Sequence, residues 1–111
     1  MSAPACLIFF GIRYDVDPRD VSALEARSHP PQLLARAHGL DAYWVSLEAV
    51  EDAAAYLFLG KKLGLVGPED AAELQWSGAE LCDLFERVTS TLRVAGLTGA
   101  PALHCCEIPD A

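Results

Sequence analysis

The sequence predicts an α+β fold, a two-layer sandwich in which a mostly antiparallel sheet of four to five strands is covered by one long C-terminal helix and one or two short N-terminal helices. Three observations support this fold class. A fully capped amphipathic segment follows Ser77. Strand-like stretches with short links follow one another between residues 43 and 76. The chain has 111 residues, of which 52% are hydrophobic, and this suits a single domain over residues 1–111.

The first predicted element is a strand over residues 6–14, which carries a near-continuous apolar run. Such a run is typical of a strand that is buried on both faces, or of a central strand under a helix layer. Asp17 followed by Pro18 is a helix-start signal, because the N–H that proline lacks would have no partner at that position anyway. We expect a short helix here with Val21 and Leu24 facing inward, although the same stretch is also compatible with an extended conformation.

A second helix-start signal is the sequence SHPP over residues 28–31. It predicts a helix that ends at His38, with Gly39 in the left-handed position that commonly follows a helix. The expected inward stripe of this helix is narrow and consists of Leu33, Leu34 and Ala37.

The middle of the chain is rich in aromatic and β-branched residues, which predict strands over residues 43–47 and 55–66. Glycines inside a strand often mark a bulge or a close approach of two backbones, so we expect one of these features at Gly60 or Gly64. Residues 72–76 are compatible with a short antiparallel strand, which would be the fifth strand of the sheet.

The long helix is predicted over residues 78–95. Ser77 and Glu80 have the spacing of a capping box, and Trp76 and Leu81 have the spacing of a hydrophobic staple. Apolar residues then recur at helical spacing, and Gly96 closes the helix. The recurring residues are Leu81, Leu84, Phe85, Val88, Leu92 and Ala95. A last strand is expected over residues 102–108, where Pro109 stops it.

The segment YLFLGKKLG over residues 56–64, the capped helix and the strand after Pro101 resemble a family of small bacterial proteins filed as domains of unknown function. The resemblance spans roughly residues 20–108. It implies a bacterial cytosolic origin, and it carries no activity and no catalytic residue.

Charge and composition exclude several classes of function. Eight basic and 16 acidic residues give a net charge of −8, which argues against nucleic acid and anionic membranes as partners. No apolar stretch approaches the roughly 20 residues that cross a bilayer. The four cysteines lack CxxC spacing, so we expect reduced thiols in a cytoplasmic protein. The surplus of apolar residues in so short a chain predicts a homodimer, or another protein partner, on an apolar patch.

The most reactive-looking residues are His104, Cys105 and Cys106. Together with Cys6 on a neighbouring strand they could form a zinc site or a Cys–His nucleophile. The spacing of ligand pairs that zinc sites normally show is missing, and free cysteines commonly fill core space. We therefore predict no metal site, no cofactor and no catalytic residue.

The candidate binding residues are Lys61, Lys62 and Trp44. The two lysines adjoin, and they suggest a site for a small anion or an acidic partner on a hairpin. The alternative is that they protect an exposed strand from edge-to-edge association. Trp44 would mark an aromatic groove if its ring is exposed.

Two functions fit this sequence. The first is a non-enzymatic interaction or regulatory module, expected to be dimeric through an apolar sheet face or edge. The second is a small-ligand-binding protein or minor enzyme, with a pocket between the sheet and the long helix near the lysines and the aromatic residues.

Overall fold

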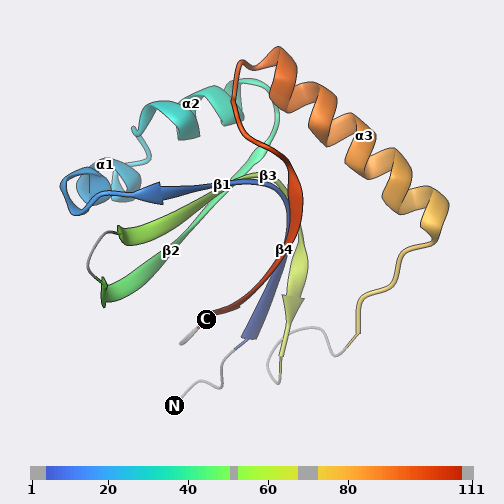
Figure 1. Cartoon of the computed structure of the whole chain (residues 1–111), viewed down its shortest axis with the longest axis horizontal. Coiled ribbons are helices and arrows are strands. Elements are labelled where there is room, and N and C mark those ends of the chain that lie inside the picture. The colour runs from blue at the N-terminus through green and yellow to red at the C-terminus, as the bar shows by residue number, and fades with distance from the viewer. Residues whose placement is uncertain (1–4, 51–52, 68–72, 109–111) are drawn as a thin grey trace.

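In the part of the chain that the structure describes, four antiparallel strands form one sheet in the order β2-β3-β1-β4. The central strands are β1 (Ala5–Val16) and β3 (Ala53–Val66), and the edge strands are β2 (Asp41–Val50) and β4 (Ala102–Ile108). The sheet is strongly curved, and the helices lie on its outer, convex side (Figure 1). This arrangement confirms the predicted α+β sandwich.

The computed structural model describes the backbone of residues 5–50, 53–67 and 73–108, and the side chains of 5–45, 55–67 and 73–107. Within these ranges the fifth strand predicted over 72–76 is wrong, since residues 73–76 have no regular secondary structure. A short stretch becomes a strand only where a sheet edge accepts its backbone hydrogen bonds. Here the side chain of Leu74 instead fills the space over Gly64, where an added Cβ would meet Leu74 Cδ1 at 2.7 Å.

The helical layer consists of a 3-10 turn (Pro18–Asp20), α1 (Val21–Glu25), α2 (Pro30–Ala37) and the long α3 (Gly78–Val94). The capping box of α3 is confirmed. The Glu80 N–H donates to Ser77 Oγ at 3.1 Å, and the Ser77 N–H donates to Glu80 Oε1 at 3.3 Å. None of the described helices combines the length and apolarity needed to cross a bilayer.

Two glycines face each other across the central strands of the curved sheet. Gly11 pairs with Gly60, and their φ angles are 157° and 151°. A Cβ added at Gly60 would lie 2.2 Å from the carbonyl oxygen of Phe10, so the two backbones approach too closely for any side chain. The register of β1 and β3 also shifts between Ile8 and Phe9, as in a β-bulge. The expected bulge and close approach are therefore both confirmed.

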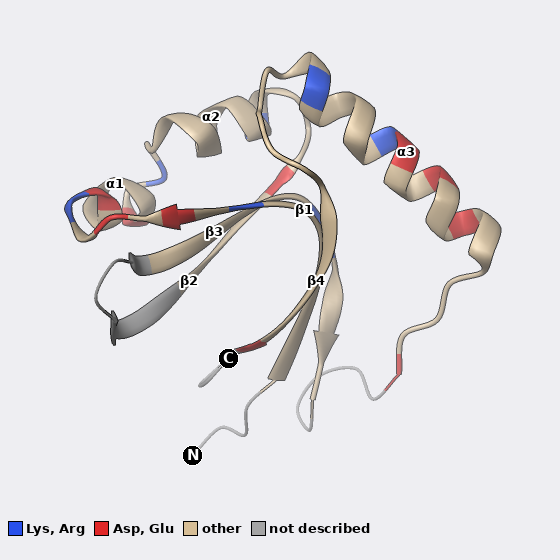
Figure 2. Ribbon diagram, viewed as in Figure 1, with Lys and Arg blue, Asp and Glu red and all other residues tan. Residues whose placement is uncertain are grey.

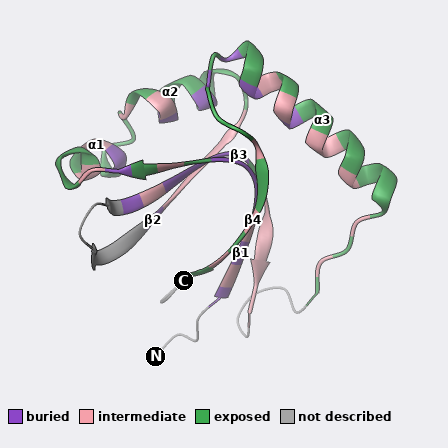
Figure 3. Ribbon diagram, in the orientation of Figure 1, coloured by how far each residue is buried: buried purple, intermediate pink, exposed green. Residues whose placement is uncertain are grey.

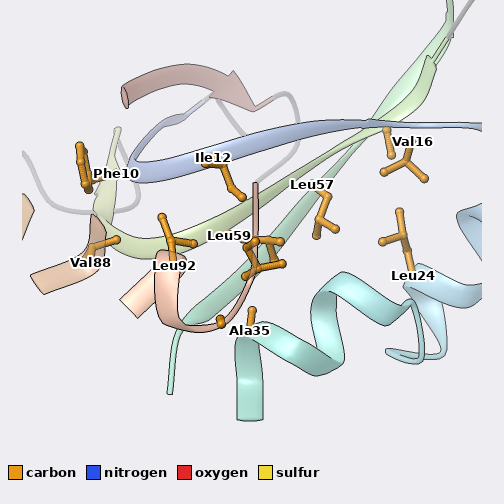
Figure 4. Close-up of a cluster of buried hydrophobic side chains, with 12 residues drawn as sticks. Phe10, Ile12, Val16, Leu24, Ala35, Leu57, Leu59, Val88 and Leu92 are labelled. Carbon is orange, nitrogen blue, oxygen red and sulfur yellow. The ribbon is translucent and has the colours of Figure 1, made fainter. Parts of the chain in front are cut away.

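The convex face carries the main core, which we call the covered face. Figure 4 shows side chains of β1 and β3 meeting those of the three helices. Its buried residues are Phe10, Ile12, Val16, Leu24, Ala35, Ala55, Leu57, Leu59, Val88, Leu92, Ala95 and Leu97. The predicted apolar stripe of α3 is confirmed, because Val88, Leu92 and Ala95 are buried in this core.

The opposite side of the sheet, the concave face, has a smaller core of its own. Leu7, Phe9, Val45 and Phe58 are buried there, and no described helix covers them (Figure 1). Their burial comes from the curvature, which brings side chains of neighbouring strands together. Since β1 buries residues on both faces, the interpretation of its apolar run is confirmed.

The predicted inward stripe of α2 is wrong. Leu33 and Leu34 are 52% and 39% exposed, whereas Ala35 and Gln32 are buried. The buried amide of Gln32 has hydrogen-bond partners, because its nitrogen donates to the Leu24 carbonyl at 3.4 Å and its oxygen accepts from the His29 N–H at 3.2 Å. A polar side chain whose hydrogen bonds are satisfied can thus be buried while a neighbouring leucine is exposed.

Candidate functional site

Lys61 and Lys62 lie on β3 directly after the part of this strand that pairs with β2. Gly60 is the last residue of β3 that pairs in register with the start of β2, at Asp41. The Asp41 carboxylate contacts both lysines at this end of the pairing. Its Oδ2 accepts the Lys62 N–H at 2.9 Å and lies 3.7 Å from Lys61 Nζ. From Lys61 onward, β3 has a strand partner on its β1 side only among the described residues.

The two lysine side chains lie on opposite faces of the sheet, because neighbouring residues of a strand alternate. Lys62 Nζ lies 5.0 Å from the ring centroid of Tyr43 on the concave face. Lys61 is exposed on the covered face, next to α3. Both lysines line a hollow of about 310 Å³ next to α3, but their side chains leave the strand on opposite faces of the sheet.

A groove runs between α3 and the end of β3. It consists of two hollows of about 310 and 240 Å³, which share Lys61, Leu84 and Arg87 as lining residues. Trp76 lines the larger hollow and His38 the smaller one. Lys61 lies beside Asp41, and Arg87 Nε lies 3.1 Å from Asp83 Oδ2. Lys62 also lines the larger hollow and has no carboxylate partner among the described side chains. The groove therefore has a mixed polarity.

Trp44 lies in a different place from the lysines. It pairs with Leu57 of β3, four residues before Lys61, and its half-buried ring packs against the core of the covered face. Trp44 lines a hollow of about 290 Å³ together with Arg27 and Arg36. No sequence pattern links these arginines, because they are nine positions apart and Arg27 lies in the turn after α1 whereas Arg36 lies in α2.

The cysteines of β4 meet β1, as the imagined site requires, but on two different faces. Cys105 pairs with Ile8 and Cys106 with Leu7. Alternation places Cys6 on the face of Cys105, away from His104 and Cys106. The structure therefore does not bring Cys6 together with His104 and Cys106 on one face of the sheet. Among the described residues, no three His, Cys, Asp or Glu side chains are placed to hold a metal ion.

The environments of these side chains are those of packed residues. Burial raises the pKa of the Cys6 thiol above its ordinary value, and the neighbouring Cys105 and Cys106 raise it further. Cys6 is therefore a poor nucleophile, since only the thiolate reacts. His104 Nε2 lies 3.1 Å from the Gly11 carbonyl oxygen, and its ring lies edge-on to Phe58 with centroids 5.3 Å apart. The carbonyl can only accept, so this nitrogen carries the hydrogen.

The outer edge of β4 is the most open stretch of the sheet. This strand pairs with β1 on one side, and within the described ranges no strand pairs on its other side. Its residues are mostly exposed, and Leu103 is 51% exposed on the covered face (Figure 3). Next to it, α3 has a hollow of about 330 Å³ lined by Phe85, Glu86 and Arg93. The ring of Phe85 stacks on Phe10 of β1 at 4.2 Å, so this hollow opens beside the sheet.

Comparisons with known proteins give no relative for this chain. No family model matches it, and neither the curated proteins nor the solved structures contain a match. The resemblance to small bacterial domains of unknown function therefore stays a prediction. The function has to be argued from the surface of the molecule alone.

Proposed function

We propose that this protein is a non-enzymatic interaction module that assembles with a second copy of itself by pairing the two β4 edges. The observation that carries the proposal is the open outer side of β4 with the exposed Leu103 beside it. The net charge of −8 and the four free cysteines fit a cytoplasmic bacterial module that binds protein rather than nucleic acid or membrane.

The β4 edge lacks the devices with which proteins usually prevent edge pairing. Such devices are lysines, an interior proline, a bulge or an inward-pointing charge. Strand β4 has the sequence ALHCCEI, in which Glu107 is the single charged residue (Figure 2). Its backbone groups are therefore open to an added strand.

A second copy of the chain is a suitable partner for this edge. An isologous dimer places two β4 strands antiparallel across a two-fold axis. If the axis passes through Cys105, Glu107 of one copy lies opposite Leu103 of the other. The like charges of the two Glu107 side chains are then kept apart, which avoids the main cost of pairing identical strands.

The test is sedimentation velocity on matched charge variants. We expect the wild-type chain to be a dimer at about 100 µM, in the range typical of modest interfaces. Leu103→Lys places a charge on the β4 edge and is expected to give a monomer. Val94→Lys alters another exposed apolar residue, 74% exposed on α3, and is expected to leave the dimer intact. A monomeric wild type, or equal effects of the two variants, would contradict the proposal.

Cysteine cross-linking tests the register. A variant that keeps only Cys105 is expected to form a disulfide-linked dimer on mild oxidation, because the two thiols lie near the axis. A variant that keeps only Cys82, an exposed residue of α3, is the matched control and is expected to stay uncross-linked. Higher salt is expected to strengthen the dimer, because it screens the repulsion between two acidic chains. Cross-linking of Cys82 alone would place the interface on α3 instead.

A second candidate is a small-ligand-binding protein or minor enzyme that uses the groove between the sheet and α3. The observation in its favour is that Trp76 and Lys61 line the same hollow of about 310 Å³. Native mass spectrometry of protein purified from its own host tests this candidate. A retained small molecule that is lost in Lys61→Ala would favour it, and the absence of such a molecule would leave the interaction module.

A further inference from the structure

Each of the three helices on the covered side is followed by a residue with a positive φ angle. Two of these residues are glycines, and the third is an arginine. After α2 and α3 the chain turns through Gly39 and Gly96, both with φ of 75°. In each case the following N–H bonds back to the helix, as Leu40 does to the Ala35 carbonyl at 2.9 Å. After α1 the same turn is made by Arg27, with φ of 58° and the Ser28 N–H donating to the Ala23 carbonyl at 2.9 Å.

Arg27 is the one non-glycine residue with a positive φ in the described part of the chain. This conformation is strained for residues with a Cβ, and glycine is strongly preferred there. Strained positions persist where the side chain has a use, so the outlier directs attention to what the Arg27 side chain reaches.

The Arg27 side chain reaches the hollow of about 290 Å³ beside Trp44. Arg36 of α2 and the buried Gln32 line the same hollow, and no aspartate or glutamate is among its lining residues. Two exposed arginines therefore line one small hollow with no described carboxylate beside them. The chain as a whole carries twice as many acidic as basic residues, which makes this grouping unusual.

Of the other six lysines and arginines, four have a carboxylate oxygen within 3.7 Å, namely Arg13, Arg19, Lys61 and Arg87. Lys62 and Arg93 have no such partner among the described side chains, but neither of them lines the hollow beside Trp44. No such ion pair involves Arg27 or Arg36 among the described side chains. Both of these arginines therefore keep their donors available, and guanidinium groups bind carboxylates and phosphates in a bidentate manner.

We infer that the hollow formed by Arg27, Arg36 and Trp44 is a binding site for a small aromatic anion. The two guanidinium groups hold its carboxylate or phosphate, and the indole of Trp44 contacts its ring. A volume of about 290 Å³ lies at the lower end of ligand pockets, which suits a single ring with one anionic group. This site is separate from the β4 edge, so it stands whether or not the chain dimerises.

The test is fluorescence titration of a Trp76→Phe chain, in which Trp44 is the single indole. Phenyl phosphate and benzoate are the probes for the two kinds of anion, and benzamide is the uncharged control. We expect saturable quenching by at least one of the two anions, and at least tenfold weaker quenching by benzamide. Equal binding of benzamide and benzoate, or no quenching by either anion, would overturn the inference.

Variants separate a binding role of Arg27 from a merely structural one. Arg27→Gly relieves the strained turn, so we expect the melting temperature to rise by about 4 °C while affinity for the anion falls at least tenfold. Arg36→Gln is expected to lower affinity similarly without a change in melting temperature. Arg93→Gln removes the same charge from α3 and is expected to leave affinity unchanged. If Arg27→Gly stabilises the fold and still binds the anion normally, the site is not there.

Discussion

The two faces of this sheet are both apolar, yet they are buried by different means. The covered face is packed by three helices that supply Leu24, Ala35, Val88 and Leu92. The concave face buries Leu7, Phe9 and Phe58 without a described helix, by curving the sheet around them. A sheet of this size can therefore bury both sides with one helical layer, provided that its central strands bend.

The cost of this solution is that edges remain open. A barrel closes a curved sheet by pairing its first and last strands. Here β2 and β4 are not neighbours in the sheet order, so each has a free side in the described structure. The β4 side is the less protected of the two, and the proposed dimer follows from that difference.

The largest expected effect comes from breaking the bend that separates the two faces. Gly60→Ala would place a Cβ 2.2 Å from the Phe10 carbonyl oxygen. We expect a loss of about 3 kcal/mol or more in unfolding free energy, measured by urea denaturation, because neither backbone can move away. Gly78→Ala, at a position with free space around it, is the matched control and is expected to be nearly neutral. A Gly60→Ala chain of normal stability would show that the close approach does not exist.

A matched pair of leucines tests whether the concave face is a real core. Leu7 on that face and Leu59 on the covered face are both 0% exposed. We expect Leu7→Ala and Leu59→Ala to cost about the same, roughly 3 kcal/mol each in urea unfolding. If Leu7→Ala cost less than about 1 kcal/mol, the concave side would be loosely packed and the comparison of the two faces would fail.

A smaller effect is expected at the start of the helix that covers most of one face. Ser77→Ala removes the oxygen that accepts the Glu80 N–H, and should cost about 1 kcal/mol of unfolding free energy. Ser90→Ala, an exposed serine within α3, is the control and should change stability by a few tenths of a kcal/mol at most. Equal effects at both serines would mean that the capping box contributes nothing.

The smallest expected effect is a pH dependence at the end of β1, where the chain leaves the sheet for the helical layer. The pKa of Asp17 is lowered, first by the Arg19 backbone N–H and then by the Arg19 guanidinium. Its contribution to stability is therefore complete above the unfolded-state pKa of about 4, and is lost as pH falls through the lower folded-state value. Asp17→Asn should make stability fall less steeply on acidification, as measured by urea midpoints between neutral and acid pH.

The interaction of Asp17 is exposed to solvent, so the effect should be small and should weaken with salt. An unchanged acid profile in Asp17→Asn would mean that other carboxylates dominate the acid limb.

Local sequence patterns determine much of this fold. The capping box at Ser77, the apolar positions of α3 and the glycines that end α2 and α3 depend on residues within one helical turn of each other. The residues that make these interactions are close together in the sequence, so the sequence alone predicted them correctly. The fold class follows, because these elements leave few ways to cover a sheet.

Contacts between distant residues were decided only by the tertiary structure. Gln32 is buried in place of Leu33 because its amide reaches the Leu24 carbonyl of another helix. Residues 73–76 stay out of the sheet, and Leu74 packs over Gly64 instead. The separation of Lys61, Lys62 and Trp44 depends on strand register, which no local pattern specifies.

The candidate binding site shows the same limit most clearly. Arg27 and Arg36 look like two ordinary surface arginines in the sequence. They become a pair only when the turn after α1 and the packing of α2 place both beside Trp44. Helix ends and apolar stripes are set by neighbours along the chain, whereas faces, edges and hollows are set by the way the elements pack against one another.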